Sequence, residues 1–450
     1  MVLESVLQLL KNKDYKTLKS LLSQGNPADI AKLLDELPRD EAVISFRLLP
    51  KELAADTFAH LEGHNRKALI SAFSDKELEE MLRELFIDDT VDLIEEMPAA
   101  VVKRILQHTD PQARAIINEI LNYPKDSAGS VMTTEFVTLR KEMTVEEAFA
   151  RIRATGVDKE TIYTCYVTDD FKKLLGTVSV KELLLSDYKT TIEEIMEDNP
   201  ISVKTTDDKE LVAKQLTHYD FIAIPVTDTE NRLVGIVTFD DAMDVIEDET
   251  EEDFSIMAAV TPSEEDYLKT SVLTHAKNRI VWLLFLMLSA TVTGLIITYY
   301  ENAFAAVPIL VSFIPMIMGT GGNCGSQSAT MIIRGLALDE IEFKDFFKVL
   351  SKELRISIVV GILLVIANGI RILIMYHNNT DCNVFSLAIA VGLTLQLTIT
   401  LSKSLGCVLP MLAKKLGLDP AIMASPLITT VVDTCSVIIF FKISTIILGL

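Results

Sequence analysis

One acidic residue stands alone in a long apolar stretch near the C-terminus. Asp433 lies in the run AIMASPLITTVVDTCSVIIFF, where every other side chain is uncharged. An ionised carboxylate at the centre of a bilayer costs about 2.5–3.5 kcal/mol on insertion scales unless it meets water, a cation or a polar partner. The nearest basic residue, Lys442, follows the run. The sequence therefore predicts a cation site at Asp433. The alternative is a structural carboxylate that hydrogen-bonds nearby hydroxyl groups, those of Thr429, Thr430 or Thr434.

More acidic residues gather in the polar part of the chain. Residues 240–266 hold twelve Asp or Glu side chains and no Lys or Arg. Like charges three or four positions apart on a helix repel one another, so a helix here is stable mainly when cations neutralise it. A solvated acidic linker is the alternative. Two further pairs are Asp88 with Asp92, four residues apart on one helix face, and Asp208 with Glu210, at the start of a predicted helix. Carboxylates without matching Cys or His ligands favour Mg²⁺ over zinc or copper.

The 450 residues suffice for about three domains, and their composition changes near residue 277. Beyond that point, long apolar stretches approach or exceed the roughly 20 residues that a membrane-spanning helix needs. They cover residues 281–300, 303–318, 356–375, 384–413 and 421–450. The second stretch is long enough only if it continues through residues 319–333. Lys403, inside the fourth stretch, either extends toward the membrane edge or lines a vestibule.

Charged residues around these stretches predict their orientation. Lys and Arg precede the first stretch and occupy the connections after the second and the fourth, whereas the other connections carry none. Basic loops face the cytosol, so the N-terminal part is expected inside and the C-terminus outside. The first residues form an amphipathic pattern, which indicates no secretory signal peptide. A formal net charge of -22 disfavours nucleic-acid binding. The five scattered cysteines favour neither a disulfide framework nor a zinc site.

Residues 1–128 are expected to form a helical domain. Leu-Pro or Met-Pro pairs recur at Pro38, Pro50 and Pro98. Proline is tolerated in the first turn of a helix but not in its interior, so these residues mark the ends and starts of short helices. Stacked short helices of this kind form superhelical modules.

A strand-and-helix pattern then occurs twice at an offset of 59 residues. Each copy has two strands joined by a turn and followed by a helix, and the matching pairs are Val167 with Val226, Gly176 with Gly235, and Ser179 with Thr238. This α/β doubling resembles a tandem CBS pair, with copies expected over residues 129–192 and 193–248. Such pairs bind adenine nucleotides in some proteins and are structural in others.

The whole chain resembles the MgtE family of magnesium channels. The resemblance rests on the order of its parts and on the motifs GTGGNCGSQSAT and PLITTVVD. It implies a multidomain membrane protein in which an acidic connecting (plug) helix over residues 249–276 precedes a five-helix transmembrane domain over residues 277–450. It also implies a homodimer in the cell (inner) membrane that conducts hydrated Mg²⁺ into the cytosol. Cytosolic Mg²⁺ would close the pore by binding among the helical domain, the CBS pair and the plug helix, and the resemblance also implies ATP binding at the CBS pair.

The resemblance also assigns roles in the membrane. Asp433 matches the pore carboxylate, and Asp419 matches an ion position near the cytosolic mouth. Thr429 and Ser425 precede Asp433 by one and two turns, where the family pattern often has Asn and Ala. The glycine-rich motif supplies further expected pore-lining residues: Gly321, Gly322 and Asn323.

A set of acidic residues matches the positions that sense Mg²⁺ in the family. They are Asp56, Asp88, Asp92, Asp208, Glu210, Asp220, Asp241, Asp244, Glu249, Glu252 and Asp253. Asp56 differs from the family pattern in the length of its acid. Mutual repulsion among these carboxylates favours an open arrangement, and cations that bind only the closed arrangement shift the balance toward it.

Other classes of protein fit the sequence less well. An intramembrane aspartyl protease needs a second membrane aspartate, and the other apolar stretches hold none; no enzyme is expected. A chloride channel is disfavoured by the lone acid. A membrane-anchored nucleotide sensor and a broader Mn²⁺ or Co²⁺ transporter stay open as alternatives.

Overall fold

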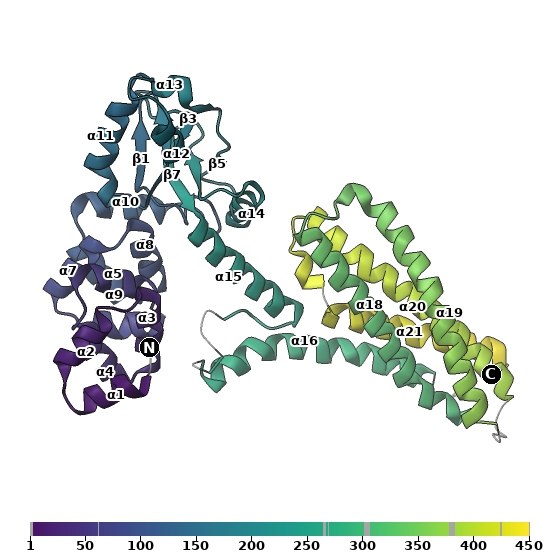
Figure 1. Ribbon diagram of the computed structural model, residues 1–450. Coiled ribbons are helices and arrows are strands. Elements are labelled where there is room, and N and C mark those ends of the chain that lie inside the picture. The colour runs from purple at the N-terminus through teal and green to yellow at the C-terminus, as the bar shows by residue number, and fades with distance from the viewer. Residues whose placement is uncertain are drawn as a thin grey trace. The chain divides into compact units, whose positions relative to one another are not determined.

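The computed structural model describes residues 3–61, 63–263, 267–268, 270–300, 307–377, 383–423 and 425–449 (Figure 1). The chain forms two compact units, Met1–Glu247 and Asp248–Leu450. The first unit contains the short helices and the strands, and the second contains the long apolar helices.

Short helices make up the first part of the chain. Their bounds are α1 Leu3–Lys11, α2 Tyr15–Leu22, α3 Pro27–Glu36, α4 Arg39–Phe46, α5 Lys51–Ala59, α6 Gly63–Ala72, α7 Asp75–Glu84, α8 Ile87–Glu96, α9 Ala99–His108 and α10 Pro111–Ile120. Pro38, Pro50 and Pro98 are the N-caps of α4, α5 and α9. The prediction that these prolines mark helix starts is confirmed.

The helices stack in two rows. Helix α3 contacts α5, α5 contacts α7 and α7 contacts α9, while α4, α6, α8 and α10 contact one another in the same way. From α3 onward, each helix therefore packs mainly against the helix two positions along the chain, as in other helical repeat modules. Figure 1 shows this stack in purple and blue. The predicted helical N-terminal domain is confirmed.

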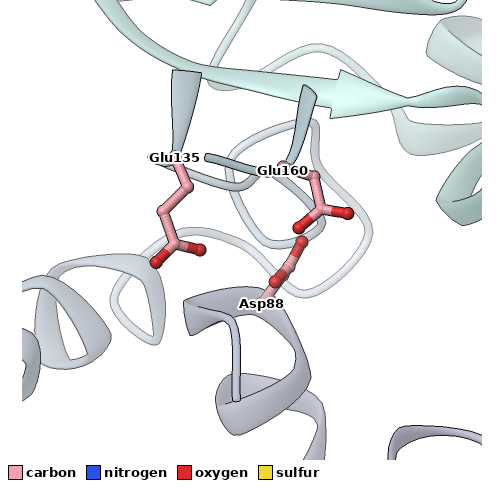
Figure 2. A group of neighbouring side chains, drawn as sticks. All are labelled: Asp88, Glu135 and Glu160. Atoms are coloured by element: carbon pink, nitrogen blue, oxygen red, sulfur yellow. The ribbon is translucent and has the colours of Figure 1, made fainter. Parts of the chain in front are cut away.

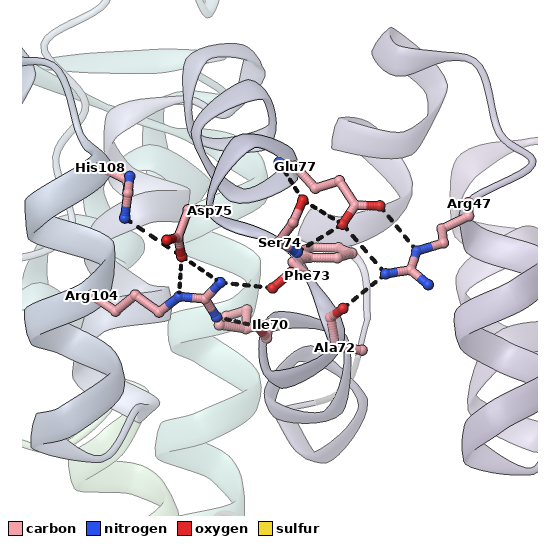
Figure 3. Close-up of polar contacts among 9 residues, drawn as sticks. All are labelled: Arg47, Ile70, Ala72, Phe73, Ser74, Asp75, Glu77, Arg104 and His108. Atoms are coloured by element: carbon pink, nitrogen blue, oxygen red, sulfur yellow. Dashed lines mark hydrogen bonds and ion pairs between the residues drawn. The ribbon is translucent and has the colours of Figure 1, made fainter.

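Two arginines join neighbouring helices of the stack where α6 ends and α7 begins (Figure 3). Arg104 donates to the carbonyl oxygens of Ile70 and Phe73, at 2.9 and 2.7 Å, and pairs with Asp75. Arg47 donates to the Ala72 carbonyl at 2.8 Å and pairs with a second acid of α7. The last carbonyls of a helix lack partners within it and carry partial negative charge. The guanidinium groups therefore satisfy the end of α6.

The strands belong to two similar repeats. The first contains β1 Phe136–Leu139, α11 Val145–Thr155, η1 Gly156–Asp158, β2 Thr161–Thr168, β3 Leu174–Ser179, α12 Val180–Leu185, α13 Ile192–Ile195 and β4 Glu197–Asp198. The second contains β5 Val203–Lys204, α14 Lys209–Tyr219, β6 Ala223–Thr227, β7 Leu233–Thr238 and α15 Phe239–Met257. Their sheets have the orders β1-β2-β3-β4 and β5-β6-β7, each with one parallel pair followed by antiparallel pairing.

The strand register repeats at the offset that the sequence predicted. Val167 lies opposite Gly176 in the first sheet, and Val226 lies opposite Gly235 in the second. The two repeats also exchange backbone hydrogen bonds: Leu174 N donates to Asn231 O at 3.0 Å, and Leu233 N donates to Lys172 O at 2.8 Å. Both donors and both acceptors are 59 residues apart in sequence. The repeats are therefore related by a local pseudo-twofold axis.

One buried apolar cluster joins the helical stack to the second repeat. It contains Leu34 and Val91 of the stack together with Leu216, Ile224 and Val226 of the repeat. Burial of continuous apolar surface is the main favourable term in folding. The stack and the CBS-like pair therefore form one folded unit.

Most of the acidic run lies in a single helix, from its first turn onward. Helix α15 starts at Phe239, directly after β7, and ends at Met257. The range expected for a separate connecting helix, 249–276, thus contains the end of α15 and the first turn of α16. The bounds given above for the domains stay predictions.

The second unit consists of long apolar helices. They are α16 Val272–Tyr299, η2 Pro308–Phe313, α18 Ile314–Ala337, η3 Phe343–Asp345, α19 Phe346–Met375, α20 Val384–Lys415, η4 Pro420–Met423 and α21 Ser425–Leu448. Five helices in the described part of the chain are long and apolar enough to cross a membrane. The second apolar stretch does continue through residues 319–333, as α18. The predicted five-helix membrane domain is confirmed.

Helix α18 lies at the centre of this packing. It contacts both α20 and α21, and α20 also contacts α19. A side-chain carbon added at Gly321 would lie 2.6 Å from Thr398 and 2.9 Å from Val432, which only glycine avoids. Ser402 of α20 also donates to the carbonyl of Gly321. Small residues allow membrane helices to approach closely, and here they hold α18 against two neighbours.

Candidate functional site

Helix α8 begins with acidic residues and lacks an N-cap side chain of its own. Phe86 occupies the N-cap position, and Asp88 and Asp89 follow in the first turn. Glu135, just before β1, accepts a hydrogen bond from the backbone N–H of Ile87 at 3.2 Å. An acceptor at a helix N-terminus satisfies a free donor and interacts favourably with the helix dipole. This contact brings an acidic side chain of the first repeat to the acidic end of α8.

Three carboxylates meet at this point (Figure 2). One oxygen each of Asp88, Glu135 and Glu160 lies within 4.8 Å of the others. Oε2 of Glu160 is buried and has no hydrogen-bond partner within the described residues. Buried polar atoms are normally paired. Oxygen ligands of this kind suit a hard divalent cation, which binds carboxylates at about 2.0–2.6 Å.

More acidic side chains surround this cluster and raise its pKa values. Burial raises the pKa of Glu160 to about 8, and the charges of Asp241 and Asp240 add to the effect. Burial and Asp241 likewise raise the pKa of Asp92 to about 7. The pKa of Asp88 is raised well above its usual range, first by burial and then by Asp241. Without a cation, Asp92 and Glu160 are therefore partly protonated near neutral pH.

Asp241 belongs to this group and is held by a residue just before its own helix. Burial raises its pKa to about 6, although the Thr238 hydroxyl donates to its Oδ2 at 2.5 Å and opposes the rise. Burial also raises the pKa of Asp89, and Asp56 adds a smaller repulsive effect. The seven acidic residues of this acidic cluster come from α8, from the first repeat and from the start of α15. They are Asp88, Asp89, Asp92, Glu135, Glu160, Asp240 and Asp241.

The structure brings together three of the predicted sensing residues, Asp88, Asp92 and Asp241. Glu135 and Glu160 were missed, because neither belongs to an acidic run or to an obvious pair on a helix face. Asp56 is exposed on α5 and acts on the cluster through its charge.

Other predicted sensing residues occupy separate places. Asp208 caps α14 and accepts from Glu210 N at 2.8 Å, while Glu210 pairs with Lys214 at 2.7 Å. Asp220 ends the same helix in a left-handed conformation with φ 54°. Helix α14 has 11 residues, so its ends are about 16 Å apart. Asp208 and Asp220 therefore do not share one ion. Asp244 follows Asp241 by one turn of α15.

The last three predicted sensing residues, Glu249, Glu252 and Asp253, lie in the second half of α15. That half belongs to the second unit. Nothing in the first unit's geometry bears on their role, which stays a prediction.

Asp433 lies near the middle of α21 and is half-buried. Within the described residues, no hydrogen bond or ion pair joins its carboxylate to another side chain. The hydroxyls of Thr429 and Thr430 instead donate to the Pro426 carbonyl, both at 2.9 Å, and Thr434 donates to the Thr430 carbonyl at 3.1 Å. The neighbouring hydroxyls are therefore engaged with the backbone and do not satisfy the acid.

The other membrane residues of interest have different surroundings. Gly322 packs against Thr429, Gly321 packs against α20 and α21, and Asn323 is exposed in this single chain. Asp419 accepts from Ala421 N at 2.7 Å in the turn before η4. The backbone of Ser425 begins α21, and its side chain lies outside the described residues.

The first repeat also carries a mainly apolar pocket of about 610 Å³. It lies between β2, α12 and the residue before β6, and it is lined by Tyr163, Thr164, Ser179, Val180, Lys181, Leu184, Leu185 and Ile222. An aromatic ring, a hydroxyl pair and one cation beside apolar walls are the features of a small-molecule site.

The helical stack, the paired repeats and the five long apolar helices define a multi-pass membrane protein with a large acidic N-terminal part. Family models match each part: a divalent cation transporter model of MgtE type over residues 314–443, an MgtE intracellular N domain over 25–126, and CBS domains over 128–188 and 192–248.

Relatives that match over nearly the full length of the chain belong to the same family as these models. The magnesium transporter MgtE of Thermus thermophilus is 34% identical over 447 residues, which is 99% of this chain and 98% of the relative. The magnesium transporter MgtE of Bacillus subtilis is 30% identical over 440 residues, 98% of this chain and 96% of the relative. The chain therefore belongs to the MgtE family. It is a multi-pass membrane protein with an intracellular N domain, and these full-length relatives are transporters rather than enzymes.

A solved structure resembles the soluble part. It is the cytosolic domain of the Mg²⁺ channel MgtE in complex with ATP, which is 36% identical, has a TM-score of 0.52 and covers 54% of this chain and 100% of that chain. The fold class predicted from the sequence agrees with these matches.

Proposed function

We propose that this chain is a Mg²⁺ channel or transporter that passes hydrated Mg²⁺ across the cell (inner) membrane into the cytosol. The full-length relatives are magnesium transporters. The observation that carries the proposal is the Asp433 carboxylate, which has no hydrogen-bond or ion-pair partner within the described residues although it lies in a membrane helix. Such a group is favourable when it faces water or a cation.

The pore is proposed to lie between two copies of the chain in a homodimer. Two Asp433 carboxylates would then offer two negative charges to one divalent ion. Mg²⁺ gives up its water reluctantly, so binding through water lets the ion enter and leave. Thr429, Ser425, Gly321, Gly322 and Asn323 are the proposed lining, and Asp419 is a proposed ion position toward the cytosol. The C-terminus lies outside in this arrangement.

Closure by cytosolic Mg²⁺ is the second part of the proposal. Ions would bind the acidic cluster around Asp88, Glu135 and Glu160, whose carboxylates repel one another when cation-free. The remaining sensing residues are proposed as further ligands: Asp56, Asp208, Glu210, Asp220, Asp244, Glu249, Glu252 and Asp253. Ions that bind only the closed arrangement stabilise it by their difference in affinity.

We also propose that the pocket beside Lys181 holds ATP. A related cytosolic domain was crystallised with ATP, and the pocket combines apolar walls with one cation and the hydroxyls of Thr164 and Ser179. Apolar walls suit an adenine ring, and a lysine suits phosphate.

A broader divalent transporter for Mn²⁺ or Co²⁺ is the second candidate, because the matching membrane model describes a divalent cation transporter. Growth rescue tests the main proposal. The chain should restore growth of a bacterium without magnesium uptake at low Mg²⁺, and Asp433→Asn should not. Asp339→Asn, which removes an exposed loop acid of the same unit, is the matched control. Rescue by Asp433→Asn would contradict the proposal, and rescue that Mn²⁺ or Co²⁺ suppresses at equal concentration would favour the second candidate.

A further inference from the structure

The membrane unit contains a buried ion pair that the sites described above do not use. Lys403 of α20 is 5% exposed and Glu353 of α19 is 8% exposed. Lys403 Nζ lies 3.6 Å from Glu353 Oε2. Lys403 therefore neither extends to the membrane edge nor lines an open vestibule within this chain, the two roles that the sequence left open. Its charge is paired inside the helix bundle.

A third side chain completes the contact. Ser328 of α18 donates to Glu353 Oε2 at 2.6 Å and accepts from Lys403 Nζ at 3.1 Å. The serine is also buried. The three side chains form a charged triad that links α18, α19 and α20. Buried charges are tolerated when they are paired and hydrogen-bonded, as they are here.

Helix α18 connects this triad to the helix that carries Asp433. One turn before Ser328, a side-chain carbon at Gly325 would lie 2.6 Å from Ile428 of α21. A turn earlier, one at Gly322 would lie 2.9 Å from Thr429. Distances this short leave no room for a side chain between α18 and α21 at these two glycines, and packed interiors transmit displacement. A shift of α18 at Ser328 therefore moves the segment of α21 that precedes Asp433.

We propose that the triad of Lys403, Glu353 and Ser328 is a positioning device that fixes α18 against α21 and so sets how well ions pass Asp433. The proposal rests on the proposed function, because it concerns the same pore. Lys403 and Glu353 are positioning residues, and they do not touch the ion.

The charge arrangement predicts a distinctive pattern among variants. Removing one member of a buried pair leaves the other charge without a partner, which costs more than replacing both members. Lys403→Met or Glu353→Gln alone should therefore disturb α18. The double variant leaves no unpaired charge and should recover much of the wild-type behaviour. A pair that only contributed packing would give additive losses instead.

Single-channel conductance of the full-length protein in planar bilayers tests this inference, because it reads pore geometry and not protein amount. We expect each single variant to lower Mg²⁺ conductance by about tenfold and the double variant to recover to within about threefold of wild type. Lys403→Arg should retain most of the conductance. Lys348→Met, which removes an exposed lysine of α19, is the matched control and should behave as wild type.

Two outcomes would overturn the inference: single variants with wild-type conductance, or a double variant no better than the worse single variant. If a single variant fails to insert, Ser328→Ala decides, because it keeps both charges and removes only their link to α18. Wild-type conductance in Ser328→Ala would then reject the positioning role. Asp433→Asn separates the two proposals, since its conductance falls if the pore assignment is correct, whatever the triad variants do.

Discussion

Glu160 differs from the other members of the acidic cluster in one carboxylate oxygen. Its Oε2 atom is buried without a hydrogen-bond partner in the described part of the chain, and its pKa is raised to about 8. A group in this state either keeps a proton or binds a cation. At cytosolic pH the two compete, so Glu160 is the residue at which loss of a charge should have opposite effects with and without Mg²⁺.

We expect Glu160→Gln to stabilise the cation-free soluble part and to weaken its stabilisation by Mg²⁺. A related cytosolic domain was crystallised without the membrane part, so residues 1–257 are a suitable fragment for thermal unfolding. At pH 8.5 without divalent ions, Tm should rise by roughly 2–4 °C, the shift that about 1 kcal/mol produces in a domain of this size. The increase in Tm on adding Mg²⁺ should be smaller than in wild type. Glu146→Gln, an exposed acid of the same repeat, should change neither value, and a lower Tm for Glu160→Gln would contradict the account.

The raised pKa values also predict how Mg²⁺ binding depends on pH. Asp92 and Glu160 have pKa values of about 7 and about 8, above their ordinary 3.8 and 4.5. Their neutral forms therefore contribute stability that is fully present below the ordinary values and is lost as pH rises through 7 and 8. Mg²⁺ needs the ionised forms, so it must displace these protons.

The half-saturating Mg²⁺ concentration of the soluble part should therefore increase as pH falls from 8.5 to 6. The expected change is about tenfold per pH unit for each proton displaced. Calorimetry in two buffers of different ionisation enthalpy should detect protons released on binding. A half-saturating concentration that is constant over this range would exclude the acidic cluster as the binding site.

Residue types and spacing identified part of this site and could not identify the rest. Asp88 and Asp92 share one face of a predicted helix, and Asp241 lies in an obvious acidic run. Glu135 and Glu160 flank ordinary strands, and only the folded contact between α8 and the first repeat brings them to Asp88. In the same way, Lys403 was visible in the sequence, but its partner Glu353 lies on another helix. Pairings between distant segments have no local signal.

Among the elements, the junction of α6 and α7 depends on two arginines. Arg104 binds two carbonyls at the end of α6 and pairs with Asp75 (Figure 3). Because the Ile70 and Phe73 carbonyls have no partner within the helix, loss of the guanidinium leaves them exposed to water or buried without a hydrogen bond.

Arg104→Ala should destabilise the soluble part by about 1.5–3 kcal/mol, the range for hydrogen bonds that involve a charged group. Urea unfolding of residues 1–257 measures the change. Arg83→Ala is the matched control, because Arg83 makes only an exposed pair with Glu79, which is worth about 0.3–0.5 kcal/mol. Equal losses for the two variants would show that Arg104 has no special role in the stack.

The pocket between β2 and α12 gives another prediction. Lys181 is its cationic lining residue, so Lys181→Ala should weaken ATP binding to the soluble part as measured by calorimetry. Lys189→Ala, an exposed lysine after the same helix, should bind ATP as wild type does. Unchanged ATP affinity in Lys181→Ala would show that ATP does not bind in this pocket.

Most elements could be predicted from the sequence because their signals are local. Proline at Pro38, Pro50 and Pro98 marks helix starts, and the offset of 59 residues reappears as an identical strand register. The exact extent of α15 could not be predicted, because acidic residues continue through a helix that starts inside the second repeat. Like charges lower the stability of a helix, and tertiary contacts at Ala242 and Val245 hold its first part in place.

At the scale of the whole molecule, the account joins an acidic soluble unit that binds cations with a membrane unit that passes them. Both depend on carboxylates that ordinary protein contacts leave unsatisfied: Glu160 in the first unit and Asp433 in the second. Membership of the MgtE family supports this pairing of a cation-binding unit with a membrane unit that passes cations. The central claim is that the ionised carboxylate of Asp433 binds the transported ion as it passes through the membrane.

Mg²⁺ uptake into proteoliposomes, followed with an enclosed Mg²⁺-sensitive dye, tests this claim most directly. Wild type, Asp433→Asn and Asp433→Glu should be compared at equal amounts of correctly inserted protein. The account predicts that Asp433→Asn reduces uptake to near the level of empty liposomes, while Asp433→Glu, which keeps the charge, retains measurable uptake. Uptake by Asp433→Asn at the wild-type rate would contradict it.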